Sequence, residues 1–397
     1  MKKTLVSAAL AAALVPSLSS NSSAQLDKLK LSDAIQTLTY SGDLRLRNDV
    51  RARRGGGLNN VGGISNASQQ RYRLRFGMEA ALPDNLTAAF RLASGTGEQV
   101  STNQSAGKLG SQKSIFIDLV YLKWKPTLHD NATTAFVAGR MVNPLWRVYS
   151  SDVLWDDDFN PEGLGESVEW LFGDAGLSVF ANGLQMVADQ DSNSGKNQWE
   201  FSGQLGFEKT LPLESRLRMA GAIHKWSDEG RSSLNPSVIQ DGNRRLANGA
   251  LGNRFTVGEV TGQLSGWAGR LPVNLQATVV RNLVARGFSA PASFAGPVGR
   301  DAYQFGAIVG AAKVKGSWEL AYFKKYAQVD ATMADVADSD FGDGGTNRVG
   351  HIVWAAYAPR DWMQLKVKAF FTDTIDRQFA PGDKAVNRLQ TDLAIKF

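Results

Sequence analysis

The sequence contains no cysteine. Disulfide bonds, thiolate metal sites and cysteine nucleophiles are therefore excluded. The sequence also lacks long hydrophobic runs: its alanine-rich stretch at residues 7–15 is too short to cross a bilayer. No other window approaches the roughly 18 apolar residues that a membrane-spanning helix needs. A transmembrane helix is therefore not expected anywhere in the chain.

Histidine is scarce as well, with three residues, His129, His224 and His351, far apart in the sequence. They do not form the HExxH spacing of a zinc protease helix. The sequence has no P-loop, no GxSxG nucleophile elbow and no Ser-His-Asp order typical of a hydrolase. Nothing in the sequence therefore points to catalysis, and we expect no enzyme activity, no cofactor and no metal.

The N-terminus has the three parts of a secretory signal peptide: a basic start, a short apolar stretch and small residues up to Ala24. We expect residues 1–24 to be removed, which lowers the formal net charge from +6 to +4 because Lys2 and Lys3 are lost. The alternative is an uncleaved anchor helix. It is disfavoured because Pro16 and a serine-rich run end the apolar stretch early.

Apolar and polar residues alternate along the first predicted strands, which gives each strand one apolar face and one polar face. The apolar faces are Leu44, Leu46, Val50 and Ala52 in residues 40–53, and Tyr72, Leu74, Phe76, Met78 and Ala80 in residues 71–82. The opposite face of these strands, and of the strand at 86–93, is rich in arginine. The pattern predicts a sheet with apolar surroundings on one face and water on the other.

Strands of this kind continue to the C-terminus, about sixteen in all, each of a length that suits a tilted crossing of a hydrocarbon core of about 30 Å. Short turns alternate with long polar connections, as in bacterial transmembrane barrels. An open sheet edge in lipid would leave unpaired backbone groups, so the sheet must close. The predicted fold is all-β: a transmembrane antiparallel up-and-down β-barrel at residues 38–397, after a short periplasmic segment at 25–37. The alternative is a soluble β-sandwich or propeller that packs its apolar faces together.

The last residues also form a predicted strand. Leu389, Thr391, Leu393, Ile395 and Phe397 share one face. A strand that ends at the last residue on an aromatic side chain resembles the terminal assembly signal of bacterial outer-membrane barrels. The alternative is an ordinary edge strand that ends at phenylalanine by chance.

Two loop motifs resemble the putative porin family of Gram-negative bacteria. The first, at residues 139–146 and 151–163, resembles the segment after the fifth strand of that family. The second is Ser-Asp-Phe-Gly-Asp-Gly-Gly-Thr-Asn at residues 339–347. Further similar residues are 41–47 in the first strand, 350–351 and Phe397. The resemblance implies a large single-chain β-barrel pore and a homotrimer as in general porins, but no particular substrate.

Arginines occupy the polar face of the first three strands: Arg45, Arg47, Arg51, Arg71, Arg73, Arg75 and Arg91, together with Arg53. One arginine on the lipid face near the midplane costs about 2–4 kcal/mol. We therefore predict that these residues line the pore. The alternatives are the solvated face of a soluble sheet and nucleic-acid binding. An exported chain has no evident nucleic-acid partner.

An acidic loop at residues 142–162 occupies the place where, in porins, the loop after the fifth strand folds inward and narrows the pore. Its acids are Asp152, Asp156, Asp157, Asp158 and Glu162. We hypothesise an inward-folded constriction loop whose carboxylates face the arginines, which would create a transverse field in a narrow passage. The alternative is a solvated external loop.

A second acidic loop contains Asp338, Asp340 and Asp343 among glycines in residues 338–347. Closely spaced oxygen ligands suit calcium, but the ordered EF-hand pattern is missing. The loop is therefore either an exposed turn or a calcium site.

These features predict an outer-membrane porin of a Gram-negative bacterium, a water-filled channel for passive diffusion of small polar solutes and ions, with a mild anion preference. Its expected partners are outer-membrane lipid and lipopolysaccharide, these solutes and ions, and two further copies of the chain in a homotrimer.

The sequence leaves two alternative functions. A phospholipase-like barrel enzyme would need a serine or histidine on the lipid-facing wall, and the pattern predicts none. A secreted carbohydrate-binding β-protein would use exposed tryptophans such as Trp146 and Trp155.

Overall fold

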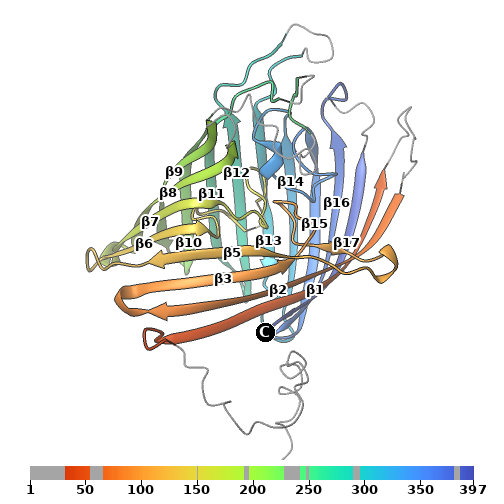
Figure 1. The fold of residues 1–397 in the computed structure, drawn as a ribbon. Coiled ribbons are helices and arrows are strands. Elements are labelled where there is room, and N and C mark those ends of the chain that lie inside the picture. The colour runs from red at the N-terminus through yellow and green to blue at the C-terminus, as the bar shows by residue number, and fades with distance from the viewer. Residues whose placement is uncertain are drawn as a thin grey trace, which may run out of the picture.

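The chain forms one closed barrel, described here from a computed structural model (Figure 1). The structure describes residues 32–53, 66–149, 151–191, 196–227, 242–246, 250–288, 296–379 and 385–397. The expected signal peptide and most of the expected periplasmic segment lie outside these residues. No helix in the described ranges is long and apolar enough to cross a membrane.

A single antiparallel sheet contains all of the described strands. They are β1 (Thr37–Arg53), β2 (Asn66–Leu82), β3 (Leu86–Ser94), β4 (Gln104–Ser105), β5 (Ile115–Trp124), β6 (Ala132–Arg140), β7 (Glu162–Phe172), β8 (Leu177–Asp191), β9 (Lys196–Leu211), β10 (Ser215–Trp226), β11 (Thr256–Ala268), β12 (Leu271–Asn282), β13 (Asp301–Gly310), β14 (Trp318–Ala327), β15 (Arg348–Arg360), β16 (Met363–Thr374) and β17 (Val386–Lys396). Apart from the two-residue β4, sixteen strands pair with their chain neighbours around the ring. The predicted sixteen-stranded barrel is confirmed.

The barrel closes where the last strand meets the first. In this seam Leu44 lies opposite Ile395 and Asp43 opposite Lys396. The terminal residue continues the pairing, because the Phe397 amide donates to the Gly42 carbonyl at 3.0 Å and the Gly42 amide donates to the Phe397 carbonyl at 2.8 Å. A Cβ atom at position 42 would overlap the Phe397 ring, so this position requires glycine. Closure leaves no unpaired sheet edge in the ring.

Short turns and long connections fall on opposite rims, as the sequence predicts. The turn at Pro83–Asn85 joins β2 to β3, and the turn at Gly173–Ala175 joins β7 to β8. The C-terminus lies on this rim, at the bottom of Figure 1. Asp84 and Asn85 adopt positive φ angles of 59° and 60°, which asparagine and aspartate tolerate better than most residues.

The outer wall is apolar. Leu74, Phe76, Phe201 and Leu365 lie on this face and are 41–48% exposed, which a soluble protein would avoid with so many large apolar side chains together. Exposed aromatic side chains gather near the short-turn rim: Tyr40, Trp124, Trp170, Trp318 and Tyr357. An apolar band with aromatic residues at its edge matches a lipid-facing wall.

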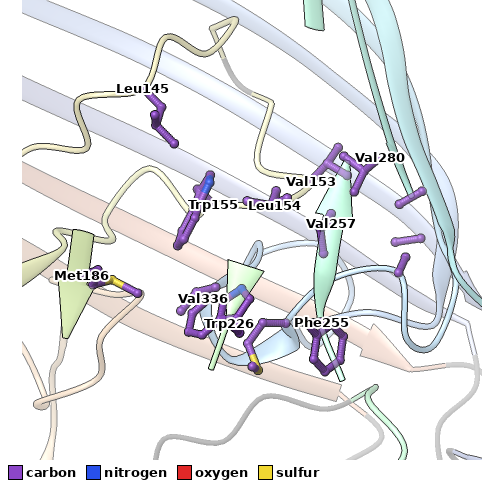
Figure 2. Close-up of a cluster of buried hydrophobic side chains, with 14 of the residues drawn as sticks. Leu145, Val153, Leu154, Trp155, Met186, Trp226, Phe255, Val257, Val280 and Val336 are labelled. Atoms are coloured by element: carbon purple, nitrogen blue, oxygen red, sulfur yellow. The ribbon is translucent and has the colours of Figure 1, made fainter. Parts of the chain in front are cut away.

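Two long connections fold into the barrel instead of leaving it. We call residues 141–161 the first inward loop and residues 328–347 the second inward loop; residue 150 is outside the described residues. Figure 2 shows Val153, Leu154 and Trp155 of the first loop against Val257 and Val280 of the wall. The second loop adds Met333 and Val336 to the same buried cluster. The barrel therefore has an apolar core on one side of its lumen.

Candidate functional site

The inner face of β1 to β3 and of β17 carries an arginine wall: Arg45, Arg47, Arg51, Arg53, Arg71, Arg73, Arg75, Arg91 and Arg388. The strand register places Arg45 opposite Arg73 and Arg47 opposite Arg71. Like charges directly opposite one another destabilise a sheet. The wall therefore requires acidic residues between its arginines.

Two aspartates of β1 neutralise the centre of the arginine wall. Asp43 lies 2.8 Å from Arg73 and 2.6 Å from Arg75. Asp49 is fully buried and lies 2.5 Å from Arg388, with Arg51 and Arg71 each at 3.6 Å. These acids share the inward parity of the arginines, so the sequence alternation already places them on this face.

The edges of the wall have separate partners. Arg47 lies 2.7 Å from Asp392 of β17, and Arg91 lies 2.5 Å from Asp118 of β5. Arg45 has no carboxylate within 4.0 Å among the described residues and donates instead to the Asn103 side chain at 2.6 Å. All of the predicted arginines thus face inward, and most of them are held by ion pairs.

The first inward loop crosses the lumen from one wall to the other. Asp158 lies 3.4 Å from Arg73 on β2. At another point of the loop, the Trp146 amide donates to the Gln204 side chain of β9 at 2.8 Å. Elsewhere the Ser151 hydroxyl donates to Thr278 of β12 at 2.9 Å. The loop is therefore attached to walls on several sides of the barrel.

The acids of this loop do not all face the arginine wall. Asp158 does face this wall. Burial raises the pKa of Asp158, but the positive charges of Arg73, Arg45 and Arg75 lower it by more, so its pKa is below the usual value. Asp157 is 58% exposed and pairs with Arg147 of its own loop at 3.5 Å.

Asp152 and Asp156 lie in a different environment. Burial, together with the nearby Asp157 and Asp338, raises the pKa of Asp152 well above its usual value. Burial, together with Asp158 and Asp338, does the same for the pKa of Asp156. These two carboxyl groups therefore face other acids across the loops rather than the arginines.

Glu162 corrects the predicted extent of the loop. It is the first residue of β7 and pairs with Arg140 at 2.6 Å, on an exposed side of the strand end. The β-ladder between β6 and β7 already includes this residue, since Arg140 and Glu162 are register partners. Its placement in the loop is therefore wrong.

The second inward loop completes the neutralisation of the arginine wall. Asp340 lies 2.9 Å from Arg388 and 3.3 Å from Arg47. Burial raises the pKa of Asp340, but Arg388 and Arg47 lower it by more, and its pKa is well below the usual value. The expectation of an exposed turn is wrong for this loop, because Phe341 and most of its neighbours are buried.

The acids expected to suit calcium have basic partners instead. Asp338 lies 2.6 Å from Lys325, and Asp343 lies 2.8 Å from Arg53. In the part of the chain that the structure describes, no group of three or more acids or histidines could hold a metal ion. The acidic composition of this loop is explained by ion pairing.

Backbone contacts join the two inward loops. The Asp156 amide donates to the Val336 carbonyl at 2.8 Å, and the Asp338 amide donates to the Asp152 carbonyl at 3.2 Å. The Ser339 amide donates to the Asp156 carboxylate at 2.9 Å. The loops therefore form one plug against the arginine wall.

The opposite wall contains a buried polar cluster under Trp155. The Ser202 hydroxyl lies 2.6 Å from His224 Nδ1, and His224 Nε2 lies 3.1 Å from Glu259. Glu200 accepts a hydrogen bond from Ser202. The sequence alone does not predict this grouping of a serine, a histidine and an acid, because the three residues come from three different strands. His224 is fully buried, and its ring packs edge-on against the Trp155 ring with 5.8 Å between the ring centres. No substrate reaches His224 in this conformation.

One histidine faces outward, contrary to the expectation that no serine or histidine lies on the lipid-facing wall. His351 of β15 is exposed on the outer wall, where its Nδ1 lies 2.8 Å from the Tyr322 hydroxyl and its Nε2 lies 3.4 Å from Lys324. Within the described residues, His351 makes no hydrogen bond to a serine. The tryptophans proposed for carbohydrate binding do not lie exposed either: Trp155 is buried in the core and Trp146 packs against Phe180.

The remaining inner surface is open and carries two lysines of β16. Lys366 and Lys368 have no carboxylate within 4.0 Å among the described residues. The Lys366 ammonium lies 4.4 Å from the centre of the Trp354 ring. It also lies 3.4 Å from the hydroxyl of Tyr149, which belongs to the first inward loop. Tyr149 is 51% exposed inside the barrel.

Comparisons with known proteins agree with this architecture. A sequence profile of the family described as "Putative porin" matches residues 59–258 and 270–397. OmpF of Salmonella typhi, solved in complex with daunomycin, is similar with a TM-score of 0.52 and 12% identity, over 91% of this chain and 97% of that chain. OprB of Pseudomonas putida, in a high-pH structure, is similar with a TM-score of 0.52 and 11% identity, over 90% of this chain and 94% of that chain. The comparison with curated proteins gives no match. At these identities the similarity to solved structures concerns the fold alone.

Proposed function

Because the chain belongs to the Putative porin family, we propose that it is an outer-membrane channel through which small polar solutes and ions diffuse passively. The observation that carries the proposal is the division of the barrel into an apolar outer wall and a charged inner wall, with the arginine wall around the lumen. A wall of this kind separates lipid from water.

The first inward loop is the proposed constriction. Its Tyr149 and Asp157 are exposed, and Asp158 attaches the loop to the arginine wall. In this proposal solutes pass between Asp157 and the lysines of β16, which carry opposite charges. Such a transverse field orients dipolar solutes and biases ions.

The proposed ion preference is mildly for anions. Among the described residues Lys366 and Lys368 have no carboxylate within 4.0 Å, whereas the carboxylates of Asp158 and Asp340 are paired with arginines. Asp157 opposes this preference. Because exposed charges are screened within about 10 Å at 0.1 M salt, the preference should weaken as salt rises.

The proposed location is the outer membrane of a Gram-negative bacterium, after removal of residues 1–24. Lipopolysaccharide is a proposed partner of the outer wall, where Lys324, His351, Lys225 and Arg281 lie toward the rim of long connections. A homotrimer is the proposed assembly.

The experiment that tests the proposal is electrical. The full chain, expressed with its native N-terminus and purified from outer membranes, is added to a planar lipid bilayer. We expect stepwise increases in current and, across a salt gradient, a reversal potential of the sign that marks anion preference. A folded, heat-modifiable protein that gives no current steps would contradict the channel, and a cation-selective reversal potential would contradict the anion preference alone.

A further inference from the structure

A cavity of about 580 Å³ lies inside the barrel near the rim of short turns. It is bounded by the turn after β13 and the turn before β16, and Tyr149 of the first inward loop is part of its lining. The volume falls in the range of about 300–1,000 Å³ that is typical of small-molecule sites. A solute that passes the proposed constriction enters this space next.

Amide side chains line one wall of the cavity. The Gln276 side-chain amide donates to Gln263 at 3.0 Å, and the Gln263 amide donates to Asn274 at 3.4 Å and to Ser265 at 2.8 Å. Gln364 lines the facing side, where its amide donates to the Ala312 carbonyl at 2.9 Å. Amides supply both donors and acceptors, which suits hydroxyl groups.

One atom of this row has no hydrogen-bond partner among the described residues. Gln276 is 5% exposed, and its side-chain oxygen is the buried atom concerned. A buried acceptor without a partner costs free energy that an apolar side chain of similar size would not cost. Gln276 lines the cavity, so its amide lies beside any molecule that occupies it.

The charges that line the cavity balance in sign, which favours a neutral solute. Glu319 and Asp361 supply two carboxylates, and Lys313 and Lys396 supply two ammonium groups. Glu319 accepts a hydrogen bond from Trp354 Nε1 through one oxygen at 2.7 Å, and its carboxylate can also accept hydrogen bonds from hydroxyl groups.

An aromatic ring completes the set. Tyr149 is half exposed and packs edge-on against Trp354 at 6.2 Å, which fixes its orientation while one part of the ring stays free. A flat aromatic surface beside polar groups suits a molecule that has an apolar face and a hydroxyl-rich rim.

We propose that this cavity is a binding site for a neutral, hydroxyl-rich solute of the sugar class, from one to two rings in size. The proposal deepens the proposed channel function, since it names a solute class that the pore would concentrate. The amide row provides recognition, the balanced charges of the lining give an ion no net attraction, and Tyr149 provides the stacking surface.

The test measures binding directly and current separately. The full chain is purified in a detergent without a sugar headgroup, and maltose is titrated into it by calorimetry, with sodium gluconate as the anionic comparator. We expect saturable binding of maltose and weaker binding of gluconate. Gln276→Leu should weaken maltose binding by about three- to tenfold, the effect of one neutral hydrogen bond. Tyr149→Ala should weaken it as well.

The matched control is Gln69→Leu, which replaces a glutamine on the inward parity of β2 that does not line the cavity. This variant should bind maltose as the unmodified chain does, and all variants should retain heat-modifiable migration. Absence of saturable maltose binding, tighter binding of gluconate, or equal effects of Gln69→Leu and Gln276→Leu would overturn the proposal. Bilayer currents of the same samples decide the channel function independently, because Gln276→Leu should leave the ion conductance unchanged.

Discussion

Arg388 of the last strand lies 2.5 Å from Asp49 of the first strand, and both side chains are fully buried on the inner face of the barrel. The pair bridges the seam between β17 and β1, where Arg388 is also 2.9 Å from Asp340 of the second inward loop. One arginine therefore holds together both ends of the sheet and the plug inside it.

Removing one partner of this pair should destabilise the barrel strongly. Asp49→Asn removes the carboxylate that neutralises the buried Arg388 and its neighbouring arginines. Breaking a buried ion pair in this way lowers the free energy of unfolding by about 3–5 kcal/mol. We expect a lower unfolding temperature and a lower urea midpoint for unfolding, both measured by heat-modifiable gel migration. Arg216→Met, at a pair that is mostly exposed, is the control and should change stability by less than about 1 kcal/mol. Equal effects of the two variants would contradict the role of the seam.

The acids of the first inward loop should differ in their effect on ion preference. Asp157→Asn should raise the anion-to-cation permeability ratio about fourfold, because a charge at about 10 Å in water changes the energies of an anion and of a cation by about 0.4 kcal/mol each, in opposite directions. Asp156→Asn should change the ratio less, since burial and its acidic neighbours raise the pKa of Asp156 and it faces the second loop. Reversal potentials across a salt gradient measure both. The interpretation fails if Asp156→Asn has the larger effect.

Acidity should affect the two inward loops in two stages. The pKa values of Asp340 and Asp343 are below the usual 3.8, so the stability that these groups contribute is present above that pH and is lost as the pH falls through their lowered values. The pKa of Asp152 is raised, so its contribution is complete at low pH and is lost as the pH rises above 3.8 and through the raised value. Docking of the loops should therefore be firmest in mildly acidic solution.

Current noise recorded from pH 3 to pH 8 checks this expectation, with tryptophan fluorescence as a second measure of loop docking. Asp152→Asn removes the carboxyl group whose pKa is raised, so loop docking should depend less on pH above pH 4. The loss of docking at strongly acidic pH should remain. A pH profile that Asp152→Asn leaves unchanged would show that this carboxyl group does not control docking.

Trp155 should anchor the first inward loop. It is 1% exposed, stacks on Phe159 at 5.5 Å and on Trp226 at 6.0 Å, and covers the buried His224 cluster. Trp155→Ala should cost about 3–5 kcal/mol of packing, enough to release the loop. We expect a larger and noisier single-channel conductance, whereas Trp318→Ala on the outer wall should leave the conductance unchanged. A quiet channel of unaltered size in Trp155→Ala would exclude the anchor.

The sequence predicts the barrel well because alternation is a local signal. Each strand shows which residues face outward, and Arg73 and Leu74 lie on the faces that their parity predicts. β5 is the exception, since its apolar residues fall on both parities. A bulge opposite Arg91 and Leu92 inserts Asp118 as an extra residue, so Ile117 and Val120 both face outward.

The contacts inside the lumen are much harder to predict. Asp49 and Arg388 are 339 residues apart, and no local pattern connects them. The composition of the second inward loop, aspartate with glycine, fits an exposed turn as well as a buried one. Its inward path depends on arginines contributed by distant strands, so only the assembled barrel determines it.

The contact between Phe397 and Gly42 also has a consequence for biogenesis. Gly42 and Phe397 lie at the meeting of the first and last strands of the ring, so the cylinder cannot be completed before β17 has formed and reached β1. Until then both margins of the unfinished sheet stay open, and such margins attract strands of other chains. Phe397→Ala, which removes a side chain at this seam, should therefore lengthen the time for which the unfinished sheet is open to such pairing.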